Sequence, residues 1–289
     1  MQRRWLPFDS EKSNKNLIII NRIEISEFNY YSNRKTLFNT GLHVLQNVKI
    51  INNVYKIIEK IYENFIYKEF DALNTETNTP VTVKILKNKA LSLRTENIIH
   101  YHNDLYTVSK IDHPSIHKIL TFFEEKTTYI LVHEYFKGTN LQSILQNKGT
   151  FSIDETINII LQLARALEIT HNNDIYHRHI TAKDVLLLPS HDKGDFSVKL
   201  TNIGFIHIID ITKINENADI MSIFPYISPE ECGVIKRNIT PSSDLYSLGI
   251  LFYQLLTNQL PFTGSTISSI IHQHIAKLPQ LPSSLNKKI

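Results

Sequence analysis

The hydrophobic pattern of the chain changes once, at Lys137 and Gly138, and this change limits the folds open to it. From about residue 54 to that point, short apolar runs alternate with polar residues at a period of two, which predicts β-strands. One helical stretch, from about Leu91 to Ile111, interrupts them. Beyond Gly138 apolar residues recur at three and four positions, the spacing of amphipathic helices. The sequence therefore predicts an α+β architecture, with a small β-rich lobe at 54–137 and a larger helical lobe at 138–289.

Short sequence patterns predict where the main strands and helices of these two lobes lie. The run Pro80–Leu86 alternates as a strand. Ser152 and Glu155 have the spacing of a capping box, which predicts the start of a long helix, and Ser243 with Asp244 predicts the start of another. Residues 1–53 carry no chemical motif, so we interpret them as an N-terminal extension of unknown role.

Charge and cysteine content exclude several classes of function. The chain has 31 basic and 28 acidic residues spread along its length, so it lacks the charge cluster that nucleic-acid binding requires. The single cysteine, Cys232, excludes an intrachain disulfide framework and suits a reducing compartment. The early apolar run Leu17–Ile20 is too short for a membrane span or a signal sequence. We expect a cytoplasmic location, with no nucleic-acid partner and no membrane span.

Seven motifs in fixed order give the strongest signal. They are VTVKIL, KIDHPSIHKIL, ILVHEYFKGTNL, IYHRHITAKDVLL, VKLTNIGF, YISPEE and SDLYSLGILFYQLLTNQLPF. Together they resemble the eukaryotic-type (Ser/Thr) protein kinase domain from about Tyr55 to Phe262. The resemblance implies the bilobal kinase fold. It also implies that the large lobe is truncated at its C-terminal end, because the last helices expected of it are missing.

The tail after Phe262 also resembles the kinase-like domain that begins large bacterial proteins with an AAA-type ATPase, GAF domains and a sensor histidine kinase. This second resemblance implies that the partners are other proteins, or further domains of a longer signalling protein.

The kinase resemblance assigns a nucleotide site. Lys84 matches the strand lysine that holds the ATP phosphates, and Asp104 falls where a helix carboxylate would pair with it. Glu134 and Phe136 fall in the hinge, where they would offer backbone groups to the adenine edge, with His133 at the gatekeeper position. The implied cofactor is ATP with Mg²⁺.

The groups that contact ATP and metal depart from the family pattern in two ways. The family's glycine-rich loop is replaced by a shortened bend, with Tyr62 and Asn64 at the first two glycine positions, which should weaken ATP binding. At the metal positions Asp184 stands where the family has Asn, and Asn202 stands where it has Asp. One carboxylate and one amide therefore remain as metal ligands, with their positions exchanged.

The catalytic loop retains the flanking residues of the family motif but lacks the catalytic base. His177 and Arg178 match the family's His-Arg pair, but His179 replaces the catalytic Asp and Thr181 replaces the catalytic-loop Lys. An imidazole accepts a proton poorly in this role, because it becomes cationic beside Arg178.

Residues with structural roles are retained. Asp244 matches the residue that braces the catalytic loop, and Glu230 matches the Glu of the Ala-Pro-Glu motif. We therefore predict a pseudokinase that serves as an intracellular signalling or scaffold module. Two alternatives remain open: an active, atypical Ser/Thr protein kinase that transfers the ATP γ-phosphate to protein, and a non-functional fragment of a larger sensor.

Overall fold

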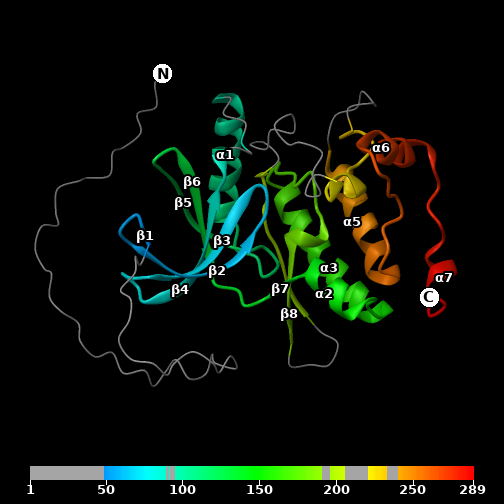
Figure 1. Ribbon diagram of the computed structural model, residues 1–289, viewed down its shortest axis with the longest axis horizontal. Coiled ribbons are helices and arrows are strands. Elements are labelled where there is room, and N and C mark those ends of the chain that lie inside the picture. The colour runs from blue at the N-terminus through cyan, green and yellow to red at the C-terminus, as the bar shows by residue number, and fades with distance from the viewer. Residues whose placement is uncertain (1–48, 89–90, 92–94, 191–195, 206–220, 233–239) are drawn as a thin grey trace, which may run out of the picture. The chain divides into compact units, whose positions relative to one another are not determined.

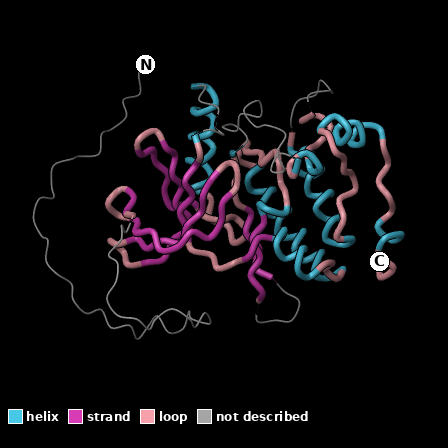
Figure 2. Tube along the Cα trace, viewed as in Figure 1, coloured by secondary structure: helices cyan, strands magenta, loops and turns pink. Residues whose placement is uncertain are grey.

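The computed structural model describes residues 49–88, 91, 95–190, 196–205, 221–232 and 240–289. Most of the expected N-terminal extension, residues 1–48, lies outside these ranges. The described chain falls into a strand-rich part followed by a helix-rich part (Figure 2). The predicted α+β class, with its β-rich and helical parts, is therefore confirmed.

A six-stranded antiparallel sheet forms the first part (Figure 1). In spatial order its strands are β1 (Ile50–Ile51), β2 (Tyr55–Glu63), β3 (Tyr67–Asn74), β4 (Thr79–Leu86), β6 (Thr128–Glu134) and β5 (Ile119–Glu125). The sheet thus begins at Ile50, inside the range interpreted from sequence as an extension. The predicted strand at Pro80–Leu86 is confirmed, and it pairs with a neighbour on each side.

Helix α1 (Thr95–Lys110) packs against this sheet near β5 (Figure 1). Its buried face carries Tyr101, Leu105 and Val108, at the three- and four-residue spacing of an amphipathic helix. The sequence pattern placed the start of this helix near Leu91, whereas the helix begins at Thr95.

The second part contains helices and one small sheet. The helices are α2 (Leu141–Lys148), α3 (Ile153–His171), α5 (Pro241–Thr257), α6 (Ile267–Ala276) and α7 (Pro282–Leu285). The strands β7 (Thr139–Asn140), β8 (Val185–Pro189) and β9 (Phe196–Leu200) form the sheet, and the 3-10 helices η3 (Ala182–Asp184) and η6 (Phe224–Tyr226) lie in the connecting segments. Among the described residues, no helix is long and apolar enough to span a membrane.

Helix starts follow the capping rules. The predicted box before α3 is confirmed: the Ser152 Oγ accepts a hydrogen bond from the Glu155 N–H, and the Glu155 carboxylate accepts one from the Ser152 N–H. Helix α5 begins at Pro241, ahead of the predicted Ser-Asp start, with Thr240 as its N-cap. Proline is favoured in the first turn because it lacks the N–H that would have no partner there.

One hydrophobic cluster joins the two parts. It includes Leu105 of α1, Leu131 of β6 and Leu163 of α3, each with an exposed fraction of 1% or less. A smaller cluster, which contains Val83 and Val132, lies within the six-stranded sheet. The shared core holds the sheet and the loop before β8 together, and the candidate site lies where they meet.

Candidate functional site

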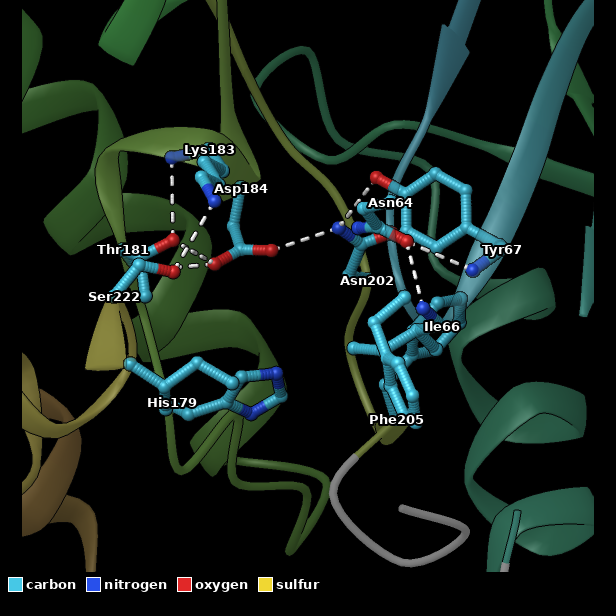
Figure 3. A pocket seen from close by; sticks show the side chains of 12 residues that line it. Asn64, Ile66, Tyr67, His179, Thr181, Lys183, Asp184, Asn202, Phe205 and Ser222 are labelled. Atoms are coloured by element: carbon cyan, nitrogen blue, oxygen red, sulfur yellow. Dashed lines mark hydrogen bonds between the residues drawn. The ribbon is translucent and has the colours of Figure 1, made fainter. Parts of the chain in front are cut away.

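A cavity opens between the β2–β3 turn and the loop that precedes β8 (Figure 3). It is lined by Asn64 and Tyr67 from the first part and by His179, Asp184 and Asn202 from the second. Its volume is about 40 Å³, which is room for roughly three water molecules. Of the residues singled out from sequence, Asn64, His179, Thr181, Asp184 and Asn202 therefore line one small cavity.

Lys84 of β4 reaches this site from the sheet and is completely buried. Its ammonium donates to the Thr201 Oγ1 and to the Asn202 Oδ1, both at 2.8 Å. Burial lowers the pKa of this ammonium, and the nearby carboxylates of Glu69 and Asp184 oppose that change. The lysine predicted to bind phosphate thus lies behind the cavity wall, bonded to Asn202, which lines the cavity.

The two candidate metal ligands contact each other directly. The Asn202 Nδ2 donates to the Asp184 Oδ1 at 2.7 Å, and the other carboxylate oxygen accepts from the N–H and the hydroxyl of Thr181 (Figure 3). Asn202 adopts a left-handed backbone, with φ of 65°, which Asn tolerates better than most residues. One carboxylate and one amide suit Mg²⁺ when phosphate oxygens complete its shell. A metal ion at this position would have to replace the Asn202–Asp184 hydrogen bond.

His179 lies on the wall of the cavity (Figure 3) and is buried. Its Nδ1 lies 3.2 Å from the carbonyl oxygen of His177, so this nitrogen carries the proton and Nε2 keeps the lone pair. Burial lowers the pKa of His179 to about 4, with Asp184 opposing the shift. At neutral pH the group in the base position is therefore an uncharged imidazole.

In the β2–β3 turn, a side chain of the turn accepts hydrogen bonds from two of the backbone N–H groups. The Asn64 Oδ1 accepts hydrogen bonds from the N–H groups of Ile66 and Tyr67, at 2.9 and 2.8 Å. A glycine-rich loop would instead direct such N–H groups at phosphate. The turn is short, because β2 ends at Glu63 and β3 begins at Tyr67, and Tyr62 is paired with Glu69 within the strands.

Two aromatic rings fill the space beneath this turn. Tyr67 and Phe205 meet edge to face with their centroids 5.8 Å apart, and Phe205 also contacts Tyr101 of α1. The Tyr67 hydroxyl lies 3.4 Å from the Asn202 Nδ2, so the ring extends toward the metal positions. The Tyr67 side chain thus forms part of the cavity wall beside Asn202.

Side chains also contact the hinge residues and form hydrogen bonds with them. The His117 Nε2 lies 3.0 Å from the carbonyl oxygen of Glu134, and the His117 ring stacks on His133 at 4.5 Å. The Glu134 carboxylate accepts hydrogen bonds from the Lys199 ammonium and from a backbone N–H. Phe136 lies near His117, with the ring centroids 6.4 Å apart. The hinge residues stand where the sequence placed them, but one carbonyl proposed for adenine already has a partner.

Asp104 does not take the predicted position beside Lys84. A Cβ atom on Gly204 would lie 3.3 Å from the Asp104 Cβ, so this side chain faces the turn that follows Asn202. The ion-pair partner of Lys84 among the described residues is Glu69 of β3, at 3.8 Å. The prediction is corrected because the two strands hold these residues directly opposite each other, whereas α1 approaches the turn and not the lysine.

The bracing residues do what the sequence predicted. The buried Asp244 accepts hydrogen bonds from the backbone N–H groups of His177 and Arg178, and from the His171 Nε2. These bonds hold Arg178 in a left-handed backbone, with φ of 71°. The His177 Nε2 donates to the carbonyl oxygen of Thr201, which ties the loop to the metal positions.

Glu230 accepts a hydrogen bond from the Ser243 hydroxyl at 2.6 Å and so anchors the segment before α5. Beside the candidate site, the Lys183 ammonium reaches into the cavity lining and bonds to the Ser222 hydroxyl at 3.1 Å.

Sequence reasoning missed Glu69, His117 and Tyr67. In the structure residues 67 and 69 of β3 are buried and 68 is exposed. The sequence signal for Glu69 is its position two residues after Tyr67, which places both side chains on one face of a strand. His117 lies within one of the quoted motifs, but nothing in the sequence indicates that its ring turns toward the hinge.

The order of these elements, with a lysine strand, a braced loop and a glycine turn around one interlobe site, defines a protein kinase fold. The chain belongs to the protein kinase family: the family model described as protein kinase domain matches residues 55–288. A solved structure of Rad53 (residues 1–466) in complex with AMP-PNP shares this fold, with a TM-score of 0.59 and 24% identity, covering 76% of this chain and 52% of that one.

Curated relatives are bacterial kinases. The chain is 28% identical over 245 residues to a probable serine/threonine-protein kinase of Clostridium perfringens, covering 83% of this chain and 34% of that protein. It is 27% identical over 237 residues to the serine/threonine-protein kinase PknA of Mycobacterium tuberculosis, with coverage of 80% and 53%. It is 29% identical over 228 residues to PrkC of Bacillus subtilis, with coverage of 78% and 34%. The chain thus spans about a third to a half of the length of these relatives.

Proposed function

We propose that this protein kinase domain is a pseudokinase: it binds ATP with Mg²⁺ weakly and acts in signalling through protein contacts, not through efficient phosphotransfer. The observation that carries the proposal is the group in the base position. His179 is buried and uncharged at neutral pH, whereas the family mechanism places a carboxylate there to orient the substrate hydroxyl and accept its proton. The catalytic-loop lysine is also absent, with Thr181 in its place.

Weakened nucleotide binding is supported by four hydrogen bonds that occupy the binding groups at three positions. Asn64 takes the turn amides, His117 takes the Glu134 carbonyl, and Asn202 takes one oxygen of Asp184. Lys84 contacts Asn202 at the cavity wall and would pair with the phosphates, while Asp184 and Asn202 would hold the metal ion. When bound, the metal ion would neutralise phosphate charge.

The setting of this domain is part of the proposal. The tail after Phe262 resembles that of kinase-like domains in large bacterial sensors, so we propose further domains of a longer signalling protein, or separate proteins, as its partners. A cytoplasmic location fits a domain that uses ATP and carries one free thiol, Cys232.

The comparisons favour a second candidate, an active atypical Ser/Thr protein kinase, because the curated relatives named above carry the names of serine/threonine kinases. One feature of the site supports it. Lys84, Asn202 and Asp184 form one hydrogen-bonded row, and the His179 Nε2 keeps a lone pair that can accept a proton. In this candidate His179 is the base and the exchanged Asp184 and Asn202 pair binds the metal.

A phosphotransfer assay separates the two candidates. The full chain is incubated with labelled ATP, Mg²⁺ or Mn²⁺ and a generic protein substrate, with Lys84→Met as the matched inactive control. The proposal expects equal, background incorporation for both proteins. Incorporation by the wild type that Lys84→Met abolishes would establish the active kinase and refute the pseudokinase.

A thermal-shift measurement with millimolar ATP and Mg²⁺ tests the binding part separately, since a ligand raises the melting temperature only when it binds the folded state. The expected shift is small and absent in Lys84→Met. No shift in the wild type would refute nucleotide binding.

A further inference from the structure

We infer that Glu69 of β3, and not an acidic residue of α1, is the carboxylate that positions Lys84 for its ligand. The inference rests on the proposed function in one respect, namely that Lys84 is the lysine that binds phosphate. It assigns a positioning role to a residue that the kinase motifs do not include.

The sheet itself brings the two charges together. Glu69 and Lys84 are directly opposite each other in the antiparallel register of β3 and β4, so their side chains project from the same face. Both side chains are buried, with exposed fractions of 11% and 0%, and the Glu69 Oε1 lies 3.8 Å from the Lys84 Nζ. This contact depends only on strand pairing.

A buried ammonium requires a compensating charge. Lys84 has hydrogen bonds to Thr201 and Asn202, but both of these acceptors are neutral. Removing a charge from water without a partner is costly, and breaking one member of a buried pair is more destabilising than losing a surface pair. Among the described residues Glu69 is the carboxylate within ion-pair distance of Lys84, and Asp184 acts on Lys84 without direct contact, so Glu69 supplies the direct part of this compensation.

Helix α1 is consequently separated from the lysine. Asp104, which occupies the position of the family's helix carboxylate, lies against Gly204, whose φ of 82° excludes most side chains. In protein kinases the lysine pairs with a helix glutamate, and the position of that helix controls activity. Here the pair lies within one sheet, so Lys84 keeps its orientation whatever the position of α1.

A double-mutant cycle on the full chain tests this assignment without any ligand. Unfolding in urea is measured for Glu69→Gln, Lys84→Met and the double variant, and then for the matched cycle of Asp104→Asn with Lys84→Met. We expect a coupling of about tenfold in the unfolding equilibrium constant for Glu69 and less than about twofold for Asp104. In the Lys84→Met background Glu69→Gln should cost little, because the buried charge that needed it is gone.

The opposite ranking of the two couplings would overturn the inference, as would equal couplings. If a variant does not fold, both cycles are repeated with the same substitutions in a stabilising osmolyte, and the same ranking is expected.

MgATP binding gives a readout that a purely structural role of Glu69 would not move. By isothermal titration we expect Glu69→Gln to weaken MgATP binding about tenfold at a temperature where the protein is folded, with Asp104→Asn within twofold of the wild type. Equal weakening by the two variants would contradict the inference. If the wild type shows no MgATP binding, the proposed function fails while the unfolding cycles still decide the role of Glu69.

Discussion

Lowering the pH from 6.5 to 5.5 is expected to destabilise the domain, because three buried histidines must stay uncharged when it folds. Burial lowers the pKa of His117 to about 3 and that of His179 to about 4, and it lowers the pKa of His133 well below its usual range. In the unfolded chain each of them titrates near pH 6.5. The unfolded state therefore binds more protons between pH 6.5 and about 4, so stability falls as the pH falls through this window.

The size of the effect follows from this proton uptake. Over the unit between pH 6.5 and 5.5, each such histidine costs about 1 kcal/mol, hence about 3 kcal/mol for the three. Glu231 acts in the opposite direction, because burial raises its pKa to about 7 and the folded carboxyl keeps its proton. It contributes at most about 1 kcal/mol of stability over the same interval. The effect of the three histidines is larger than that of Glu231, so the free energy of unfolding is expected to fall by about 2 kcal/mol. This is a sizeable share of the roughly 5–15 kcal/mol by which a typical domain is stable.

Urea unfolding at pH 6.5 and 5.5, at one ionic strength, measures this loss. His133→Met should reduce the difference between the two pH values by about 1 kcal/mol, whereas Glu231→Gln should increase it by a similar amount. His272→Gln, at an exposed position on α6, is the matched control and should leave the wild-type difference in place. A stability that is constant or rises between pH 6.5 and 5.5 would refute the reasoning.

Two further predictions concern single contacts. His117→Val frees the Glu134 carbonyl and should raise ADP affinity about three- to tenfold, the equivalent of one net hydrogen bond, as measured by calorimetry; unchanged affinity would show that this bond does not obstruct the hinge. Asp244→Asn removes the charge that accepts the loop N–H groups of His177 and Arg178, and should lower the free energy of unfolding by about 3 kcal/mol in urea titrations. A loss below about 1 kcal/mol would contradict the bracing role.

The sequence was sufficient to predict the fold and the meeting of the site residues. Lys84, Asp184 and Asn202 were placed in one site from motifs far apart in the chain, and they are joined by hydrogen bonds. Such motifs occupy fixed points of a fold, so their order constrains the structure even when the residues within them change.

The partners of these residues were harder to predict. Asp104 was assigned to Lys84 by counting along the chain, but the choice between it and Glu69 depends on which residues the strands place opposite each other. That register depends on the turn between β3 and β4, and a shift of one residue turns every side chain of a strand to the other face. A pattern of residue types does not fix a turn to that accuracy.

The departures from the family pattern act on different parts of a nucleotide. Asn64 occupies the amides of the turn at the phosphate end, His117 occupies the carbonyl at the base end, and the Asn202–Asp184 bond occupies the metal position. At about 1 kcal/mol net for each of these three positions, the proposed weakening of binding would total about a hundredfold if the positions act independently. A single substitution relieves only one of them and gains at most about tenfold. The proposed weak binding would therefore be a property of the whole site and not of one residue.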